Sequence, residues 1–158
     1  MDLRQGTSLL LRPYLAGAAG LLLLALVSAP ARTETHVIHI RDHTDTQSML
    51  FQPFFQQVGV GDTVVFRSDS PGHVTRSVFV PEEAVEWEGE AGETVRVRLD
   101  REGLYLYECV FHGRLGMAGV IQAGRGTNLE ALRDFYRDYK QKFVVYRDRL
   151  DPIIDDLR

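Results

Sequence analysis

Cysteine and lysine are both scarce in this 158-residue chain, which holds one Cys and only two Lys among its 18 basic residues. The single thiol, Cys109, excludes an intramolecular disulfide and with it the small disulfide-stapled scaffolds. Acidic residues outnumber basic ones, which gives a formal net charge of −4 with His neutral. An acidic chain argues against nucleic acid or anionic lipid as the main partner and is compatible with a basic protein partner.

A long membrane span is also lacking. The apolar stretch at residues 15–27 is short of the about 20 residues that cross a bilayer. Two arginines precede it and small residues follow at 29–31, which is the pattern of a secretory signal peptide. We expect residues 1–31 to be removed, so that the mature chain starts at Arg32, is not stably inserted in a membrane, and is periplasmic or secreted. The alternative is an uncleaved membrane anchor.

The remaining chain has the length of one ordinary domain, and its composition, 44% apolar and 25% charged over all residues, is that of a globular protein. This length excludes a large multidomain enzyme. No hydrolase motif or phosphate-binding glycine loop is present, so we do not expect an enzyme. A lone thiol in an exported chain invites oxidation unless something occupies it, although a buried, inert Cys109 is the plain alternative.

Short alternations of apolar and polar residues, separated by turn residues, run from residue 36 to residue 122. In the first of them Ile38 and Ile40 share one face, while His36 and His39 lie on opposite faces, so we expect no second metal site among the N-terminal histidines. Similar segments occupy residues 63–66, 94–99, 104–109 and 118–122. Because no helical pattern separates them, they predict an all-β sandwich or barrel over residues 32–126.

After residue 126 the pattern becomes helical. Thr127 can cap a helix, and apolar side chains recur at helical spacing from Leu129 to Tyr146, up to a break at Asp151 and Pro152. We predict an α-helical extension over residues 127–158 whose apolar stripe packs on the barrel. A dimer seam or a partner-docking surface is the alternative use of that stripe.

A thiolate, an imidazole and a thioether lie within nine residues at Cys109, His112 and Met117. They can turn toward one point, because a loop between two strands doubles back. His73 follows a Ser-Pro-Gly turn just before a strand and is expected at the same end of the sandwich. Two His and one Cys with a weak axial Met suit copper in both oxidation states. Zinc is the main competing metal, but structural zinc sites favour several cysteines and rarely use a thioether.

These residues resemble the cupredoxin family, in its plastocyanin and pseudoazurin branch. The spacing Cys109-x-x-His112-x-x-x-x-Met117 is that of the branch. Other segments resemble it as well, and the chain is most like pseudoazurin: residues 49–53, 60–66, 72–73, 118–121 and 127–131. The resemblance covers most of the mature chain.

The resemblance implies a Greek-key β-sandwich with one type 1 (blue) copper per chain, held by His73, Cys109, His112 and Met117, and single-electron transfer in the periplasm. The partners would be redox proteins, such as a c-type cytochrome or a copper or haem reductase, that dock near His112. Copper binding and trafficking in the periplasm is the alternative function. Trafficking proteins tend to use clusters of Met and His, whereas the mature chain has only Met49 and Met117.

Two departures from the family stand out. Val74 occupies the position after the first His, where the family usually has Asn, so we expect looser support of the thiolate. Pseudoazurins also surround the exposed His with lysines, whereas residues 32–126 hold no Lys. The usual partner choice therefore cannot be carried over.

Two surface features are expected to matter for docking. The first is a small apolar patch beside His112, formed by Gly113, Arg114, Leu115 and Gly116 with Phe51 and Pro53. The second is the run of glutamates at residues 82–93, extended by Glu108 on the outward side of its strand. This run is either a solvated edge or a surface that steers a basic partner.

Overall fold

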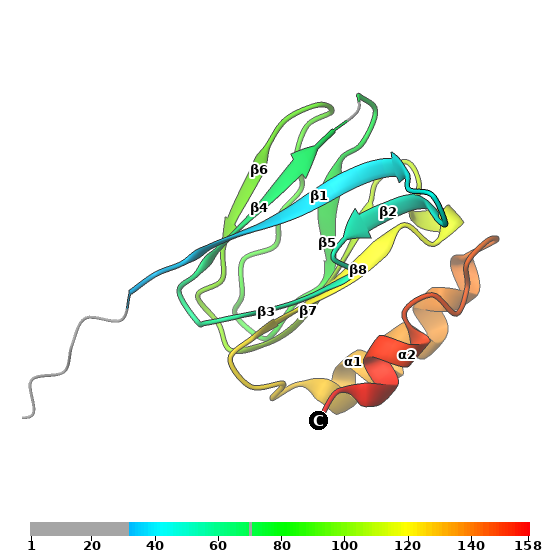
Figure 1. Ribbon diagram of the computed structural model, residues 1–158. Helices are drawn as coiled ribbons and strands as arrows, with labels where there is room; N and C mark the ends of the chain where they lie inside the picture. The colour runs from blue at the N-terminus through cyan, green and yellow to red at the C-terminus, as the bar shows by residue number, and fades with distance from the viewer. Residues whose placement is uncertain (1–31, 70) are drawn as a thin grey trace, which may run out of the picture. The chain divides into compact units, whose positions relative to one another are not determined.

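Two four-stranded sheets form the core of the fold in the computed structural model (Figure 1), which describes residues 32–69 and 71–158. The predicted signal peptide, residues 1–31, lies outside the described residues. The first sheet has the strand order β2-β1-β4-β6 and the second β3-β8-β7-β5. The strands are β1 (Thr35–His43), β2 (Ser48–Gln52), β3 (Phe55–Val58), β4 (Thr63–Ser68), β5 (Thr75–Phe79), β6 (Val95–Arg98), β7 (Gly103–Cys109) and β8 (Ala118–Ala123).

The predicted all-β sandwich is confirmed. In β1, Ile38 and Ile40 are buried, as alternation requires. In and just after β6, Val97 and Leu99 are buried while the arginines between and beside them are exposed. The sequence pattern missed β2 and β3, which are short and lack this clean alternation.

Aromatic side chains lie among aliphatic ones in the core between the sheets. Phe51 lies edge-on to Tyr107 and to Phe66, with ring centroids 4.8 Å and 6.2 Å apart, and Phe66 stacks on Trp87 at 5.8 Å. Such offset and edge-to-face pairs add to the free energy gained by burial. Cys109 and Met117 belong to this same core, so one end of it continues directly into the candidate site.

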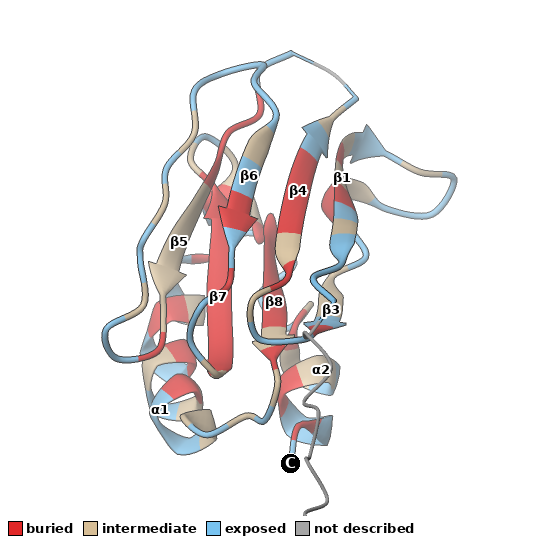
Figure 2. Ribbon diagram, turned by 90° about the vertical axis from the view of Figure 1, so that its left-hand side faces the viewer, coloured by how far each residue is buried: buried red, intermediate tan, exposed pale blue. Residues whose placement is uncertain are grey.

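A second core covers the outer face of the second sheet (Figure 1). Leu104 and Leu106 of β7 pack there with Leu132 and Tyr136 of α1 (Leu129–Tyr139). α2 (Asp151–Asp156) adds Ile154. Since β7 is covered on both faces, every one of its residues is buried (Figure 2).

The helical extension differs from its predicted form. α1 ends at Tyr139 and is followed by a short 3-10 turn, η2 (Lys140–Lys142), and an extended Phe143. Pro152 lies in the first turn of α2, where its missing N–H costs no helical hydrogen bond. Tyr146, predicted on the buried stripe, is 44% exposed because the chain has already left the helix.

The start of α1 is tied to β7. Asn128 is the N-cap in place of the predicted Thr127, and its side chain makes no cap hydrogen bond. Instead, its Oδ1 accepts from Leu104 N at 2.7 Å and its Nδ2 donates to Leu104 O at 3.0 Å. The helix is therefore fixed to the strand that ends at Cys109.

Candidate metal centre

The four predicted site residues come from the end of the second sheet and the loops beside it. Cys109 is the last residue of β7, His112 lies in the loop that follows, and Met117 directly precedes β8. His73 lies just before β5. Register pairs Thr75 of β5 with Cys109 of β7, so β5 carries His73 to the same end.

Backbone hydrogen bonds close the loop between β7 and β8. Cys109 N donates to Met117 O at 2.9 Å, and Leu115 N donates to His112 O at 2.9 Å. A short 3-10 turn, η1 (Gly113–Leu115), and Gly116 with φ of 75° bring the chain back. Gly116 suits this left-handed conformation because it has no Cβ.

Three donor atoms converge. Cys109 Sγ lies 3.6 Å from His73 Nδ1 and 3.5 Å from His112 Nδ1, and the two Nδ1 atoms lie 3.2 Å apart. Metal bonds of about 2.0–2.3 Å to nitrogen and sulfur fit these separations when one ion lies among the three atoms. One thiolate and two imidazoles are also the ligands of a copper centre with one long axial bond.

Met117 completes the set. Its side chain is fully buried and belongs to the same core cluster as Cys109. Its backbone carbonyl oxygen accepts the hydrogen bond from Cys109 N. The two residues therefore lie opposite each other, and their side chains start from neighbouring backbone positions. The four residues are thus positioned as a type 1 copper site.

Burial differs among the four. His73, Cys109 and Met117 are at most 1% exposed, while His112 is partly exposed. Burial, reinforced by the neighbouring His73, lowers the pKa of His112. A lowered pKa favours the neutral imidazole that can bind a metal.

Asp42, near the end of β1, supports His73 from the far side of its ring. Its Oδ1 lies 2.7 Å from His73 Nε2, and His73 itself is 1% exposed. An Nε2–H bonded to a carboxylate fixes the tautomer and leaves Nδ1 free as a ligand. The sequence offered no sign of this contact, because 31 residues separate the pair.

Val74 leaves the ligand loops connected through the backbone. Its side chain is buried, and its carbonyl oxygen accepts a hydrogen bond from Val110 N at 2.9 Å. The amide side chain usual in the family is absent, but this bond still links the segment of His73 to that of Cys109.

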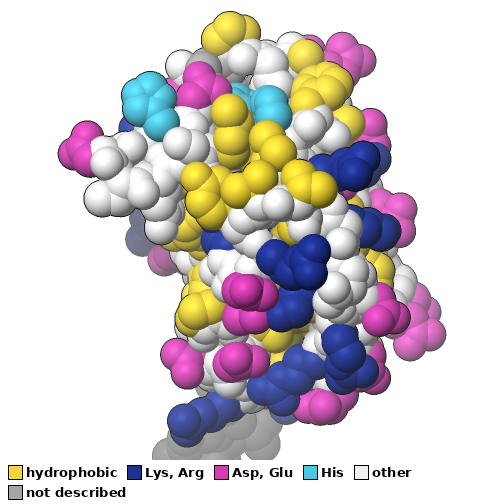
Figure 3. Space-filling model, turned by 90° about the vertical axis from the view of Figure 1, so that its right-hand side faces the viewer, with side chains coloured by type: hydrophobic (Ala, Val, Ile, Leu, Met, Phe, Trp, Pro, Cys, Tyr) yellow, Lys and Arg dark blue, Asp and Glu magenta, His cyan; other side chains and the backbone are white. Residues whose placement is uncertain are grey.

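The exposed patch beside the site differs from the predicted one. Phe51 is completely buried in the core, and Gly113 and Gly116 are buried too. Pro53 is exposed as predicted, and the other exposed apolar side chains in this part of the chain are Phe111, Val144, Val145 and Tyr146. Val144 N donates to Arg114 O at 2.7 Å, which places the last three against the ligand loop. On the face shown in Figure 3, a band of hydrophobic side chains lies next to a histidine.

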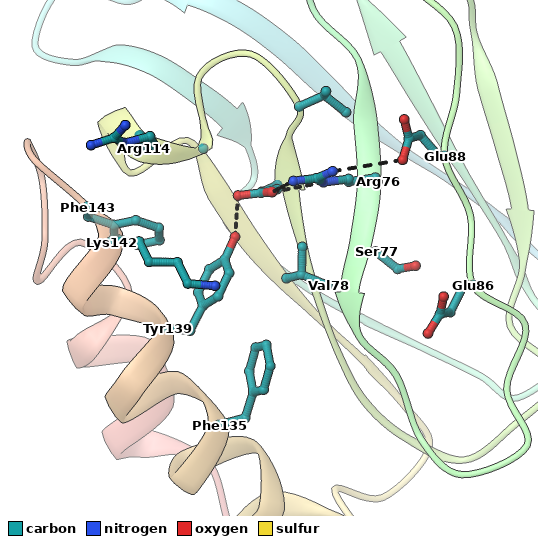
Figure 4. A pocket seen from close by; sticks show the side chains of 13 residues that line it. Arg76, Ser77, Val78, Glu86, Glu88, Arg114, Phe135, Tyr139, Lys142 and Phe143 are labelled. Atoms are coloured by element: carbon teal, nitrogen blue, oxygen red, sulfur yellow. Dashed lines mark hydrogen bonds and ion pairs between the residues drawn. The ribbon is translucent and has the colours of Figure 1, made fainter.

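Glu108, predicted to be exposed, is buried because the C-terminal extension covers it. Arg76 of β5 donates to its Oε1 from Nη2 at 2.6 Å and from Nε at 2.9 Å, and Tyr139 of α1 donates to its Oε2. Figure 4 shows Arg76 and Tyr139 converging from strand and helix. The hydrogen bond to Glu108 raises the pKa of Arg76. Burial, together with the hydrogen bond to the same carboxylate, raises the pKa of Tyr139. Glu108 therefore adds nothing to the acidic surface.

The N-terminal histidines bind carboxylates singly. His36 Nε2 lies 2.9 Å from Asp62, and His39 Nδ1 lies 3.3 Å from Asp69. Among residues 32–69 and 71–158, one group of three or more His, Cys, Asp or Glu ligand atoms gathers closely enough for a metal, and it is the one at Cys109. Among the described helices, none has the length and apolar character of a membrane span.

Comparisons with known proteins agree with this arrangement. The family model described as copper binding proteins, plastocyanin/azurin family, matches residues 38–124. Pseudoazurin from Paracoccus pantotrophus is 30% identical over 121 residues, which are 75% of this chain and 81% of that protein. Pseudoazurin from Methylorubrum extorquens is 24% identical over 147 residues, 91% of this chain and 96% of the relative. The crystal structure of native pseudoazurin from Hyphomicrobium denitrificans superposes with a TM-score of 0.66 at 29% identity, covering 78% of this chain and 98% of that one.

Two buried tyrosines allow a matched test of the Glu108 network. Tyr107 Oη has no hydrogen-bond partner among the described residues, whereas Tyr139 Oη donates to Glu108. We expect Tyr139→Phe to lower the free energy of unfolding by about 1–3 kcal/mol, and Tyr107→Phe to change it by less than about 1 kcal/mol or to raise it. Denaturant unfolding of the two metal-free variants measures the difference, and equal losses would contradict the assignment.

Asp42 is expected to strengthen metal binding through His73. Asp42→Ala should weaken copper affinity by roughly 10- to 100-fold, and Asp42→Asn, which keeps an acceptor, by less. Competition with a chelator of known affinity measures both. Asp45→Ala, an exposed residue in the turn that follows β1, is the control, and an Asp42→Ala affinity equal to that of the control would refute the support role.

Proposed function

Since this chain belongs to the plastocyanin/azurin family of copper-binding proteins and is most like the pseudoazurins, we propose that it carries single electrons between exported redox partners. Its ligands would be Nδ1 of His73 and of His112, Sγ of Cys109 and the thioether of Met117. The observation that carries this proposal is the convergence of the first three donor atoms within 3.6 Å. We infer no enzymatic step, because four protein ligands leave no open position for a substrate.

A copper ion held by these residues would supply a one-electron couple. The protein's part is to keep the ligands in place. Cys109 and Met117 are joined across the loop by a backbone hydrogen bond, and His73 is held by Asp42. Ligands that barely move between the two charge states need little reorganisation, and fast electron exchange follows from that.

His112 is the proposed route for electrons to leave. It is the one member of the set that is partly exposed, and the apolar side chains Phe111 and Val144 to Tyr146 lie on its loop or against that loop. A small apolar patch of this kind suits brief contacts with a redox protein. A c-type cytochrome or a copper or haem reductase is the class of partner we propose.

Export is proposed on the sequence pattern of residues 1–31, with a copper-binding domain at 32–126 and the helical extension at 127–158. The mature chain then works in the periplasm or outside the cell. The intact mass of the chain purified from its native compartment distinguishes a start at Arg32 from a retained N-terminal segment.

The copper-loaded chain is expected to be intensely blue or green and to bleach reversibly with a reductant. Cys109→Ser should abolish the colour, because the thiolate is the source of the intense absorption, while Met117→Leu should keep it, because the thioether is a weak ligand. Absorption spectra and metal analysis of the three proteins test this. A colourless wild-type protein that releases Cu(I) would support trafficking instead.

Charge on the surface is expected to affect the approach of the partner. The six glutamates of the 82–93 run are all exposed, and Glu88 and Glu86 line the same pocket as Arg114 (Figure 4). We expect the rate of electron transfer to the native partner to fall as salt rises, because the Debye length shrinks from about 10 Å at 0.1 M to about 3 Å at 1 M.

Replacing Glu90 and Glu93 by Gln should slow that transfer by roughly 2- to 10-fold at low salt if the partner is basic. Asp156→Asn, an exposed residue of α2, is the control. Stopped-flow kinetics over a range of salt concentrations measures the effect, and a rate that salt does not change would remove the steering hypothesis.

A further inference from the structure

Residues 143–150, here called the C-terminal strap, lie against the ligand loop. Phe143 and Leu150 are buried at its two ends, at 1% and 0% exposure. Between them the backbone passes over Gly116, where an added Cβ would lie 2.9 Å from the carbonyl oxygens of Val145 and Tyr146. The strap therefore touches the residue that directly precedes Met117.

The side chain of Arg149 adds hydrogen bonds from the strap to the sandwich, beside the backbone bond from Val144 N to Arg114 O. Its Nη1 donates to Gly116 O at 3.1 Å and to Met49 O at 2.5 Å, and its Nη2 donates to Ser48 O at 2.9 Å. Ser48 and Met49 are the first two residues of β2, in the first sheet. One guanidinium group thus connects the ligand loop, which belongs to the second sheet, with the edge of the first.

Among the described residues, no carboxylate forms an ion pair with Arg149 within 4.0 Å. Its side chain lies over the rings of Tyr146, at 3.9 Å, and Phe54, at 5.2 Å, and burial lowers its pKa. Burying a cation is unfavourable unless its donors are satisfied. Here carbonyl oxygens and ring faces stabilise it, so its charge is directed at the backbone and not at an acidic partner.

The backbone on either side of Met117 is held from several directions. Gly116 O accepts from Ala118 N at 3.1 Å as well as from Arg149, and Met117 N donates to His112 O at 3.3 Å. Met117 itself is 0% exposed. A displacement of the Gly116 carbonyl group would therefore move the backbone of Met117, from which the thioether side chain extends.

We propose that Arg149 is a positioning residue that fixes the backbone of Met117, so that the C-terminal strap sets how closely the axial sulfur approaches the copper. This proposal rests on the ligand assignment above. It gives the extension a role beyond covering the sheet, because the axial ligand tunes the potential of a copper centre of this type.

The test compares two variants of Arg149 with a matched control in the full mature chain. Arg149→Met keeps the apolar stem and removes all donors, and Arg149→Lys keeps the charge without the fork. Arg147→Met is the control, because Arg147 lies two residues earlier in the strap and is exposed, and among the described residues its guanidinium group donates to Gln141 and to the Phe143 carbonyl oxygen. Each protein is measured for copper content, charge-transfer band ratio, electron paramagnetic resonance, reduction potential and, without copper, amide exchange.

For Arg149→Met we expect one copper per chain, a changed band ratio and potential, and about tenfold or faster exchange at the Met117 and Ala118 amides. Arg149→Lys should lie between this variant and the wild type, and Arg147→Met should match the wild type. If Arg149→Met does not fold, the comparison of Arg149→Lys with Arg147→Met decides.

Unchanged bands and potential in a folded Arg149 variant would overturn the proposal, even with a lower melting temperature, since that pattern describes a purely structural contact. A wild-type chain that binds no copper would overturn the ligand assignment instead. In that case the amide exchange of the copper-free variants would still show whether Arg149 holds the loop.

Discussion

The hydrogen bond from Cys109 N to Met117 O is the constraint on which the site depends. It closes the loop between β7 and β8, so that Cys109 and Met117, eight positions apart in the sequence, lie opposite each other on neighbouring segments. The left-handed Gly116 and the 3-10 turn at residues 113–115 follow from the need to return the chain over so short a distance. His112 then lies inside the loop, with its Nδ1 directed at the thiol.

Burial of β7 on both faces makes that constraint rigid. One face contributes Tyr105, Tyr107 and Cys109 to the core between the sheets, and the other contributes Leu104 and Leu106 to the core under α1. Glu108 would be exposed on the second face in a bare sandwich, and the extension brings Tyr139 to it while β5 brings Arg76. A strand packed in this way cannot shift without opening two cores, so Cys109 is held by the whole domain.

The sequence predicted the residues that gather at the candidate site better than the contacts that support them. Cys109, His112 and Met117 could be identified because they share one short loop, and His73 because a turn precedes it. Asp42 and Arg149 could not, since each meets the site only through contacts between distant parts of the chain: 31 residues separate Asp42 from His73, and 33 separate Arg149 from Gly116. The same limit explains two wrong predictions. The apolar side chain of Phe51 fits a surface patch and a core equally well. The end of the helix at Tyr139 is not marked by a Gly or a Pro.

The two supports also show why the site needs both sheets. Cys109 ends β7 of the second sheet and Met117 directly precedes β8, whereas Asp42 contacts His73 from β1, and Arg149 bonds to both Gly116 and the start of β2. How these two supports meet the site therefore depends on how the sheets pack, and the contact of Phe51 with Tyr107, with ring centroids 4.8 Å apart, joins the two sheets in the core. Closely packed aromatic cores resist small displacements. The sandwich therefore holds the backbone around the site rigidly, and the hydrogen bonds of Asp42 and Arg149 at its edge position His73 and Gly116.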